Sequence, residues 1–326
     1  VKLWTVHFMR ICVANLLLFI SLYILFPVLS VEMADRLGVP VAQTGVIFLF
    51  FTLGMFLIGP FHAYLVDAYK RKYVCMFSFA TMVAATAGYA FVTNITELIL
   101  LSTVQGLAFG IATTAGITLA IDITNATLRS AGNVSFSWMA RLGMIIGTAL
   151  GVFLFRTHGF ETLLYVSVAS GALGMLFVSR VYVPFRAPIG MKVCSMDRFL
   201  LPRGFIPAFN LMLIAFVPGL LLPVLAGAPS DVPVGGELIP FFALAGVGFL
   251  LSVMVVRLFF RYDNKIWLQI VTGLITMIGA MALLFSPETG WNVPAAILMG
   301  LGLGLVTPEF LMMFVKLSQH CQRGTA

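Results

Sequence analysis

Long apolar segments separated by short polar links recur along the whole chain. Each of ten such segments has about 20 residues, enough for a helix to cross roughly 30 Å of hydrocarbon. A transmembrane β-barrel would instead show segments of about ten residues in which apolar and polar positions alternate, a pattern that the sequence lacks. The sequence therefore predicts an all-α, polytopic membrane protein. The expected spans are residues 9–31, 42–65, 73–93, 97–121, 134–155, 162–183, 204–224, 237–260, 265–285 and 293–315.

The composition indicates a bilayer environment. Hydrophobic residues make up 61% of the 326 residues and charged residues 10%, and the mean hydropathy is +1.07, so a water-soluble fold would have too few polar side chains to cover its surface. The first apolar segment is too long for a removable signal peptide and lacks a small-residue cleavage site, so we expect a permanent span. The four cysteines form no CxxC pair and the four histidines are dispersed. We therefore expect no disulfide, metal site, cofactor or enzymatic cluster.

Basic residues gather on one side of the predicted topology. The chain has 19 Lys and Arg residues and a formal net charge of +7; with the N-terminus inside the cell, almost all of them fall at inner ends and loops. Arg36 and Arg156 fall outside, and Arg141 lies within the fifth span. We therefore predict a multi-pass protein of a cell membrane with a cytoplasmic N-terminus, and the short loops favour a bacterial inner membrane. No basic patch with interleaved aromatic residues accompanies the charge, so we expect no nucleic-acid partner.

A pattern of Asn, apolar residues and Pro-Val-Leu occurs twice in the chain. NLLLFISLYILFPVL begins at Asn15 and NLMLIAFVPGLLLPVL begins at Asn210, and further landmarks recur in the same order at offsets of 194 to 196 positions. The recurring pairs are Asp67 with Asp263, Gly106 with Gly302, and Arg129 with Arg323. We infer two homologous halves, residues 1–183 and 204–326, joined by a cytoplasmic linker of residues 184–203. The alternative is that similar apolar helices share these residues by chance.

The two predicted halves enter the membrane in the same direction, because an even number of spans separates the first span from the seventh. Such a parallel repeat is related by an axis along the membrane normal. This arrangement is typical of transporters.

The segment after the second span, GPFHAYLVDAYKRK, resembles a signature of the major facilitator superfamily, whose members have two six-helix halves around a central cavity. The signature runs Gly, three residues, Asp, basic, any residue, Gly, basic, basic. The matching residues are Asp67, Arg71 and Lys72. The residues that depart from it are Ala63, Ala68 and Lys70. The resemblance implies that this loop helps to hold the cytoplasmic side closed, whereas a solvated cytoplasmic loop would explain the basic residues but not Asp67.

Two further motifs lie in the fourth and fifth spans. Gln105 and Gly106 match a second pattern of the family, but Ser102 stands where that pattern has Arg. Because the resemblance links that Arg to proton movement, its absence argues against ordinary proton coupling. In the fifth span, Gly143, Gly147 and Gly151 recur every four residues and resemble the motif of proton-driven exporters, with Thr148 in place of its usual Pro. Close packing of small residues is the alternative explanation.

The chain is shorter than the resemblance implies. The family has twelve spans, and the pairing of Arg129 with Arg323 places the C-terminus at the loop before an eleventh. Roughly 50 further residues would supply two more spans, and a cavity without two of its walls would expose polar groups to lipid at a cost. We therefore expect the complete protein to continue past Ala326, with a native ten-helix protein as the alternative.

Polar side chains inside the spans are the candidates for solute binding, since uncompensated polar groups in a bilayer are costly. The resemblance implies that the first, fourth and seventh spans line the cavity. The candidates are Asn15, Gln105 and Asn210, with Tyr23, Thr113 and Thr114 extending the lining. Amides supply both donors and acceptors, which suits a hydroxyl-bearing or otherwise polar solute. Interhelical hydrogen bonding is the alternative role for the amides.

Charged residues near the cytoplasmic side form a predicted gating group. Asp122 and Arg129 flank the end of the fourth span, Arg141 lies about two turns into the fifth, and we expect Asp122 to be the acidic partner of Arg141. The complete group is Asp67, Arg71, Lys72, Asp122, Arg129, Arg141 and Asp263. His62 is the only histidine well inside a span, and we expect it only to be hydrogen-bonded. The first, fourth and seventh spans have no carboxylate at mid-depth, so no proton carrier is evident.

These observations favour an alternating-access secondary transporter of a small organic solute, with proton-driven export of a drug or sugar as the first interpretation. Uptake by symport, or facilitated diffusion of a sugar or metabolite, is the alternative that Ser102 supports. A non-transporting membrane scaffold of the same fold is the other class. The expected partners are the solute, a proton and the lipid bilayer, and we expect a monomer.

Overall fold

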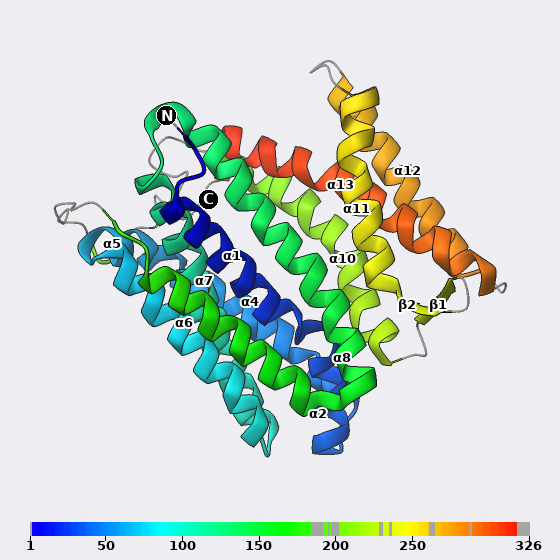
Figure 1. Cartoon of the computed structure of the whole chain (residues 1–326). Helices are drawn as coiled ribbons and strands as arrows, with labels where there is room; N and C mark the ends of the chain where they lie inside the picture. Colours follow the sequence, from blue (N-terminus) through cyan, green and yellow to red (C-terminus); the bar gives the residue numbers. More distant parts are fainter. Residues whose placement is uncertain are drawn as a thin grey trace. The chain divides into compact units, whose positions relative to one another are not determined.

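The computed structural model describes residues 2–183, 192–194, 196, 202–227, 231–234, 237–260, 265–286 and 289–317 (Figure 1). These residues form two compact units, with α1 to α8 in the first and α10 to α13 in the second. The helices of the first unit are α1 (Val6–Tyr23), α2 (Phe26–Leu37), α3 (Val41–Thr44), α4 (Val46–Ile58), α5 (His62–Ala68), α6 (Arg71–Gly88), α7 (Ile95–Asp122) and α8 (Arg129–Ser179). Those of the second are α10 (Phe205–Gly227), α11 (Phe241–Phe259), α12 (Ile266–Leu284) and α13 (Asn292–Leu317). Most of the predicted linker lies outside the described residues, so the boundaries of the halves stay a prediction.

Nine helical segments in the described part of the chain are long and apolar enough to cross a membrane. The longest, Ala131–Ser179, contains Gly159 with φ 80° and ψ 177°, a backbone conformation that favours glycine. α8 is therefore two helices joined at Gly159, and the chain reverses its direction there (Figure 1). Counting both parts of α8, the described residues contain the ten spans that the sequence predicts, and the predicted helical, polytopic fold is confirmed.

Two short strands follow α10, where the sequence predicts only a link and the start of the eighth span. β1 (Asp231–Val234) pairs antiparallel with β2 (Glu237–Pro240), with Asp231 opposite Pro240. α11 begins at Phe241, four residues after the approximate start that the sequence predicts for the eighth span. The sequence contains the signal for this hairpin, since two glycines stand between the strands and such pairs are typical of tight turns.

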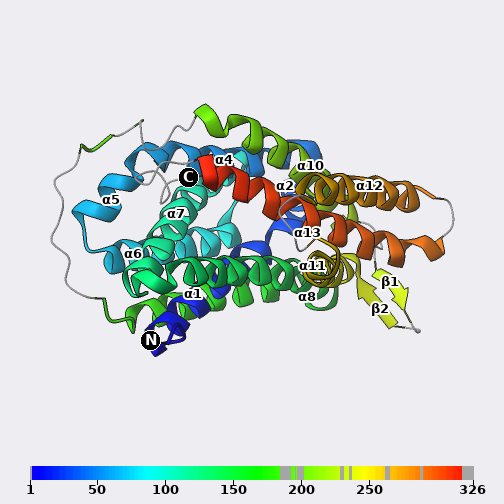
Figure 2. The ribbon, with the colours of Figure 1, turned by 90° about the horizontal axis from the view of Figure 1, so that it is seen from above.

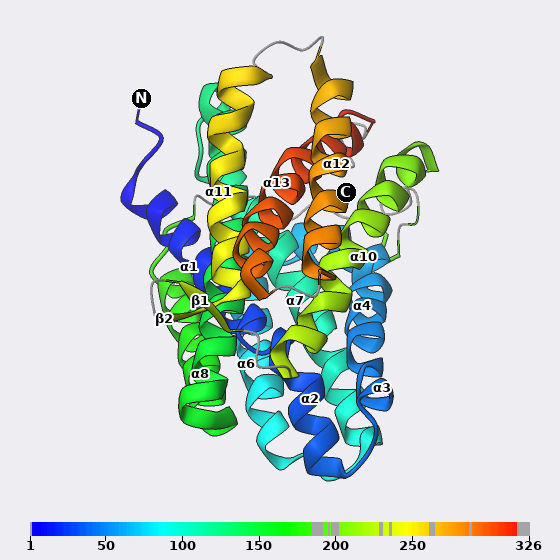
Figure 3. The same cartoon turned by 90° about the vertical axis from the view of Figure 1, so that its right-hand side faces the viewer.

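Local residue preferences explain how the first spans begin and end. Pro27 lies at the start of α2, where a missing backbone N–H is tolerated, so α1 and α2 follow one another with a break between them. α2 ends at Leu37 and is capped by Gly38, whose φ is 65°. α3 then connects α2 to α4 (Figure 3). At the start of α7 the Asn94 side chain accepts a hydrogen bond from the N–H of Glu97 at 2.9 Å, which caps the helix.

Small residues let α7 lie directly against α4 in the first unit. A Cβ atom added to Gly54 of α4 would meet the carbonyl oxygen of Thr103, and one added to Gly106 of α7 would meet that of Phe51. The two backbones therefore touch at both glycines, an approach that only glycine permits. α6 packs on α7 as well, and α1 packs along α8, so that buried residues of α1, α6, α7 and α8 form the core of this unit.

The second unit repeats the same backbone contact. α13 lies between α11 and α12 (Figures 2 and 3). The glycine contacts are Gly248 against Ile297 and Gly300 against Ala245. Each of these residues lies 194 positions after its counterpart in the first unit, so the structural partner of Gly106 is Gly300. The predicted pairing of Gly106 with Gly302 was wrong by two positions, because Gly302 faces α12 instead.

Gly106→Ala is expected to destabilise the protein, because the new methyl group would collide with the carbonyl of Phe51. Overpacking of this kind costs about 1–3 kcal/mol, and thermal unfolding of the purified protein in detergent measures it. Gly279→Ala is the matched control, since a Cβ atom at Gly279 of α12 would have no atom within 4 Å. Equal unfolding temperatures for the two variants would contradict the close contact of α4 and α7.

Candidate functional site

Six aromatic side chains from α1, α2, α4 and α7 form a continuous cluster in the first unit. This aromatic cluster consists of Phe19, Tyr23, Phe26, Phe48, Phe51 and Phe109. Phe19 and Tyr23 lie one turn apart on α1 and stack with an interplanar angle of 11° and ring centroids 6.1 Å apart. Phe26 contacts three rings at centroid distances of 5.2, 5.4 and 5.1 Å. Each such pair is worth about 0.5–1.5 kcal/mol beyond its burial.

The buried rings hold the partly exposed ones in place. Phe51 and Phe109 are each 5% exposed and lie 5.8 Å apart. Phe19, Tyr23 and Phe26 are only partly buried. In the described part of the chain the Tyr23 hydroxyl makes no hydrogen bond, so this cluster combines apolar ring surface with one unused polar atom.

The three glycines of the fifth span position α1 and with it the cluster. Cβ atoms at Gly143 and Gly147 would lie 2.7 and 3.0 Å from the Cβ atoms of Phe19 and Tyr23, respectively. Gly151 continues the contact one turn further, against the carbonyl of Ile24. α8 therefore approaches α1 at every turn. These three glycines, the glycine stripe, determine the positions of the Phe19 and Tyr23 rings.

Of the predicted solute-binding amides, Asn15 and Gln105 both bond to neighbouring helices. Asn15 is 5% exposed, and its Nδ2 donates to the carbonyl oxygen of Phe136 in α8 at 3.1 Å. Gln105 is 1% exposed; its Nε2 donates to Thr86 Oγ1 at 3.0 Å, and its Oε1 accepts from the Tyr89 hydroxyl at 2.9 Å. This geometry favours the alternative role, interhelical hydrogen bonding, for both residues.

Gln105→Leu is therefore expected to lower stability, because it removes partners from two buried hydroxyls of α6 and the turn that follows it. Leaving such groups unsatisfied costs about 1–3 kcal/mol, which thermal unfolding in detergent detects. Gln43→Leu, at an exposed position in α3, is the control. If Gln105→Leu were fully stable yet failed to bind solute, Gln105 would belong to the solute site after all.

The remaining predicted lining residues differ in what their polar atoms do. Thr113 Oγ1 donates to carbonyl oxygens of its own helix at 3.0 Å. Thr114 Oγ1 lies 3.2 Å from Nδ1 of His62 in α5. Asn210 of α10 is partly exposed, and its amide makes no hydrogen bond within the described residues. Tyr23 and Asn210 are thus the two predicted lining residues that keep unused polar groups, one in each unit.

Arg71 is the centre of the predicted gating group. Its Nη1 lies 2.7 Å from both carboxylate oxygens of Asp122, and its Nη2 lies 2.6 Å from Oδ1 of Asp67. Nε also donates to the carbonyl oxygen of Val66 at 3.2 Å. The exposed fractions of the Arg71, Asp67 and Asp122 side chains are 11%, 19% and 17%. This network joins the end of α5, the start of α6 and the end of α7.

Lys72, Arg129 and Arg141 are not part of the ion-pair network around Arg71. We expected Asp122 to pair with Arg141, but Asp122 pairs with Arg71, and the Arg141 guanidinium lies 5.2 Å from the ring centroid of Trp138 in the same helix. Because α6 and α7 pack together, the start of one helix meets the end of the other there. Lys72 and Arg129 form no ion pair within the described residues. Asp263 lies outside the described residues.

The comparison with known families decides what this architecture is. The model of the Major Facilitator Superfamily matches residues 11–326. The chain belongs to the Major Facilitator Superfamily. The resemblance seen in the segment around Asp67 is thereby confirmed. No curated protein sequence matches the chain.

Solved structures with the same superfamily fold include several transporters. A bacterial homolog of the human lysosomal transporter Spinster, inward-facing and unoccupied, has a TM-score of 0.69 at 16% identity over 98% of this chain and 76% of that one. A peptide transporter POT in complex with alafosfalin has a TM-score of 0.74 at 14% identity over 98% and 86% of the two chains. The nucleoside transporter NupG has a TM-score of 0.72 at 16% identity over 98% and 86%. At these identities the likeness shows the fold.

A polar junction in the second unit is not among the predicted site residues. Gln269 of α12 is 3% exposed, and its Nε2 donates to the carbonyl oxygen of Leu305 at 2.9 Å and to Oε1 of Glu309 at 3.1 Å. Pro308 lies inside α13 and interrupts its backbone hydrogen bonding next to this junction. A Gln in an otherwise apolar span, together with Pro and Glu in the neighbouring span, was the available signal.

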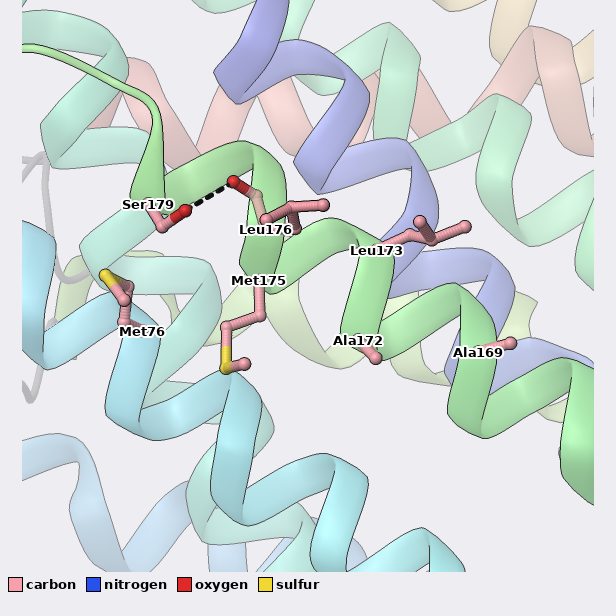
Figure 4. Close-up of a pocket in the computed structure, with 7 residues that line it drawn as sticks. All are labelled: Met76, Ala169, Ala172, Leu173, Met175, Leu176 and Ser179. Atoms are coloured by element: carbon pink, nitrogen blue, oxygen red, sulfur yellow. Dashed lines mark hydrogen bonds between the residues drawn. The ribbon is translucent and has the colours of Figure 1, made fainter.

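A surface groove of about 600 Å³ lies between α6 and the second part of α8 (Figure 4). Its lining residues are Met76, Ala169, Ala172, Leu173, Met175, Leu176 and Ser179. The Ser179 hydroxyl donates to the carbonyl oxygen of Leu176 at 2.7 Å, so the groove offers no free hydroxyl. None of the predicted site residues lines it. Within the described residues no group of three or more His, Cys, Asp or Glu side chains could hold a metal ion.

Proposed function

We propose that the protein is a secondary transporter that exports a small, largely apolar aromatic solute in exchange for protons. The observation that carries this proposal is the aromatic cluster with the unused hydroxyl of Tyr23. In this superfamily the two halves rock around a central site, and the first and fourth spans line it. α1 and α7, which carry Phe19, Tyr23 and Phe109, are those spans.

The polar atoms of the candidate lining support an aromatic solute over a sugar. Asn15, Gln105 and Thr113 use their polar atoms on the protein, which leaves Tyr23 in the first unit and Asn210 in the second. A sugar needs many hydrogen-bond partners, and each unmet one costs free energy. A planar ring with one or two polar groups would instead stack on the cluster and bond to Tyr23. The related fold serves peptide and nucleoside transporters, so the fold alone does not choose the solute.

The glycine stripe supports export as the direction of transport. Gly143, Gly147 and Gly151 resemble the exporter motif, and their contacts with α1 set the positions of Phe19 and Tyr23. Facilitated diffusion or uptake is the second candidate, and Ser102 favours it because it stands where proton-coupled relatives have Arg. The distribution of basic residues supports a cytoplasmic N-terminus, and the short loops favour a bacterial inner membrane. We propose that the protein acts as a monomer.

The proposal is tested in everted membrane vesicles with an imposed pH gradient, acidic inside. We expect the vesicles to accumulate radiolabelled chloramphenicol, a neutral aromatic probe, and to release it when nigericin collapses the gradient. Maltose, the polar probe, should not accumulate, and vesicles without the protein are the control. If chloramphenicol equilibrates across the membrane whether or not the pH gradient is present, the protein is assigned to facilitated diffusion and not to export. Transport of maltose in preference to chloramphenicol would refute the assigned solute class.

A further inference from the structure

His62 has an unsatisfied ring nitrogen in the interior of the first unit. It is the first residue of α5 and is 7% exposed. Nδ1 lies 3.2 Å from Thr114 Oγ1, whereas Nε2 is buried and has no hydrogen-bond partner. A Cβ atom at Gly110 of α7 would lie 3.6 Å from Nε2, and its other neighbours there are Ile58 and Met55. The free nitrogen therefore points at an apolar helix contact.

The surroundings of His62 suit only the neutral ring. A neutral imidazole has one donor and one acceptor, and Thr114 satisfies one nitrogen in either tautomer. An imidazolium carries an N–H on both nitrogens, so the second one would need an acceptor that this contact does not contain. The charged ring would be accommodated only after α5 moves relative to α7 and Nε2 reaches water or another acceptor.

We propose that His62 is a proton-binding site whose protonation is coupled to the contact between α5 and α7. The proposal rests on the proposed exchange of solute for protons and names the residue that takes up the proton. A ligand shifts a conformational equilibrium by the difference in its affinity for the two states. Because the packed contact accepts only the neutral ring, a proton on His62 favours the state in which this contact is open.

Other ionisable groups on the neighbouring helices lie away from Nε2. α4 carries none, and α7 carries only Glu97 and Asp122, near its two ends. α5 itself carries Tyr64 and Asp67. On α6 the ionisable residues are Arg71, Lys72, Tyr73 and Cys75, all in its first two turns. Within the described residues, the one hydrogen-bond partner of His62 is Thr114.

The same two helices carry the predicted gate. α5 supplies both His62 and Asp67, and α7 supplies both Thr114 and Asp122. Thr114 and Asp122 are eight residues apart, or about 12 Å along one helix. A movement that separates His62 from α7 therefore also strains the network in which Arg71 joins Asp67 to Asp122. Protonation of His62 would in this way loosen the cytoplasmic network.

The test is a pH titration of the whole protein in lipid nanodiscs without solute, followed by NMR of ¹⁵N-labelled histidine and methyl-labelled methionine. Met55 packs beside Gly110 and reports on the contact; Met55→Leu and His62→Gln assign the two signals. We expect the Met55 signal to shift as the pH is lowered, with the midpoint of His62 protonation. His62→Gln should abolish this shift, and the control His158→Gln, at an exposed position, should leave it unchanged.

Two outcomes would overturn the proposal: a Met55 signal that stays constant while His62 protonates, and a Met55 shift that persists in His62→Gln. If His62→Gln does not fold, Thr114→Val replaces it, since it keeps the ring and removes the partner of Nδ1. That variant should move the midpoint of the Met55 shift by at least about half a pH unit, and an unchanged midpoint would equally refute the coupling. Because no solute is present, the result is independent of whether chloramphenicol is transported.

Discussion

Arg71→Ala is expected to lower the stability of the protein and to reduce transport at least about tenfold. The substitution leaves Asp67 and Asp122 without their shared cation, although both carboxylates are less than one-fifth exposed. Removing one partner from a buried ion pair costs about 3–5 kcal/mol, and the remaining exposure places the cost here at or below the lower end of that range. Thermal unfolding in detergent and uptake of chloramphenicol by everted vesicles measure the two effects.

Lys72→Ala is the matched control for the Arg71 substitution. Lys72 is the adjacent residue of α6 and forms no ion pair within the described residues, so its removal should change stability by less than about 1 kcal/mol. The triple variant Arg71→Met, Asp67→Asn, Asp122→Asn should recover part of the lost stability, because it leaves no charge unpaired. Equal behaviour of Arg71→Ala and Lys72→Ala would show that the network does not hold the ends of α5, α6 and α7 together.

Phe26→Ala is expected to weaken solute binding at least about tenfold, or roughly 1.4 kcal/mol. Phe26 contacts three other rings of the aromatic cluster, so its loss removes stacking surface and also frees its neighbours. Equilibrium binding of radiolabelled chloramphenicol to the purified protein measures the effect. Phe77→Ala, on a ring of α6 that is 76% exposed, is the control and should bind normally. Equal affinities in the two variants would exclude the cluster from the site.

Tyr23→Phe separates the two parts of the proposed recognition. It keeps the ring that stacks on Phe19 and removes only the hydroxyl, which has no partner within the described residues. A single hydrogen bond to a neutral solute is worth about 0.5–1.5 kcal/mol. The affinity should therefore fall a few-fold while the unfolding temperature stays unchanged, a combination that a structural role for the hydroxyl would not give.

The sequence was sufficient to predict the spans, because a helix that crosses a bilayer must be continuously apolar over about 20 residues. It was insufficient at the β1–β2 hairpin, where a short apolar segment is compatible with strand or helix. The repeat was recognisable from Asn and Pro landmarks, yet its register around Gly106 was wrong by two residues. Sequence landmarks such as Asp67 and Asp263 gave that register, whereas the contacts that define it lie between the backbones of helices.

The candidate site was harder to predict than the fold. Gln105 and Asn15 are polar residues in apolar spans, but composition does not say whether such a residue faces a neighbouring helix or a solute. The structure places both against neighbouring helices. The aromatic cluster could not be predicted, because the chain contains 30 Phe residues. Nothing in the sequence distinguishes Phe residues that contact one another from those that face lipid. The partner of Asp122 depended on which helix ends meet, and helix packing alone determines that.

Photolabelling tests most directly the claim that the aromatic cluster binds the transported solute. The protein in nanodiscs is irradiated with a diazirine derivative of chloramphenicol, and the labelled residues are located by mass spectrometry. We predict labelling of α1 and α2 around Tyr23 and Phe26, suppressed by excess chloramphenicol and reduced in Phe26→Ala but not in Phe77→Ala. Labelling confined to the groove that Met76 and Met175 line, or labelling that excess chloramphenicol does not suppress, would contradict the account.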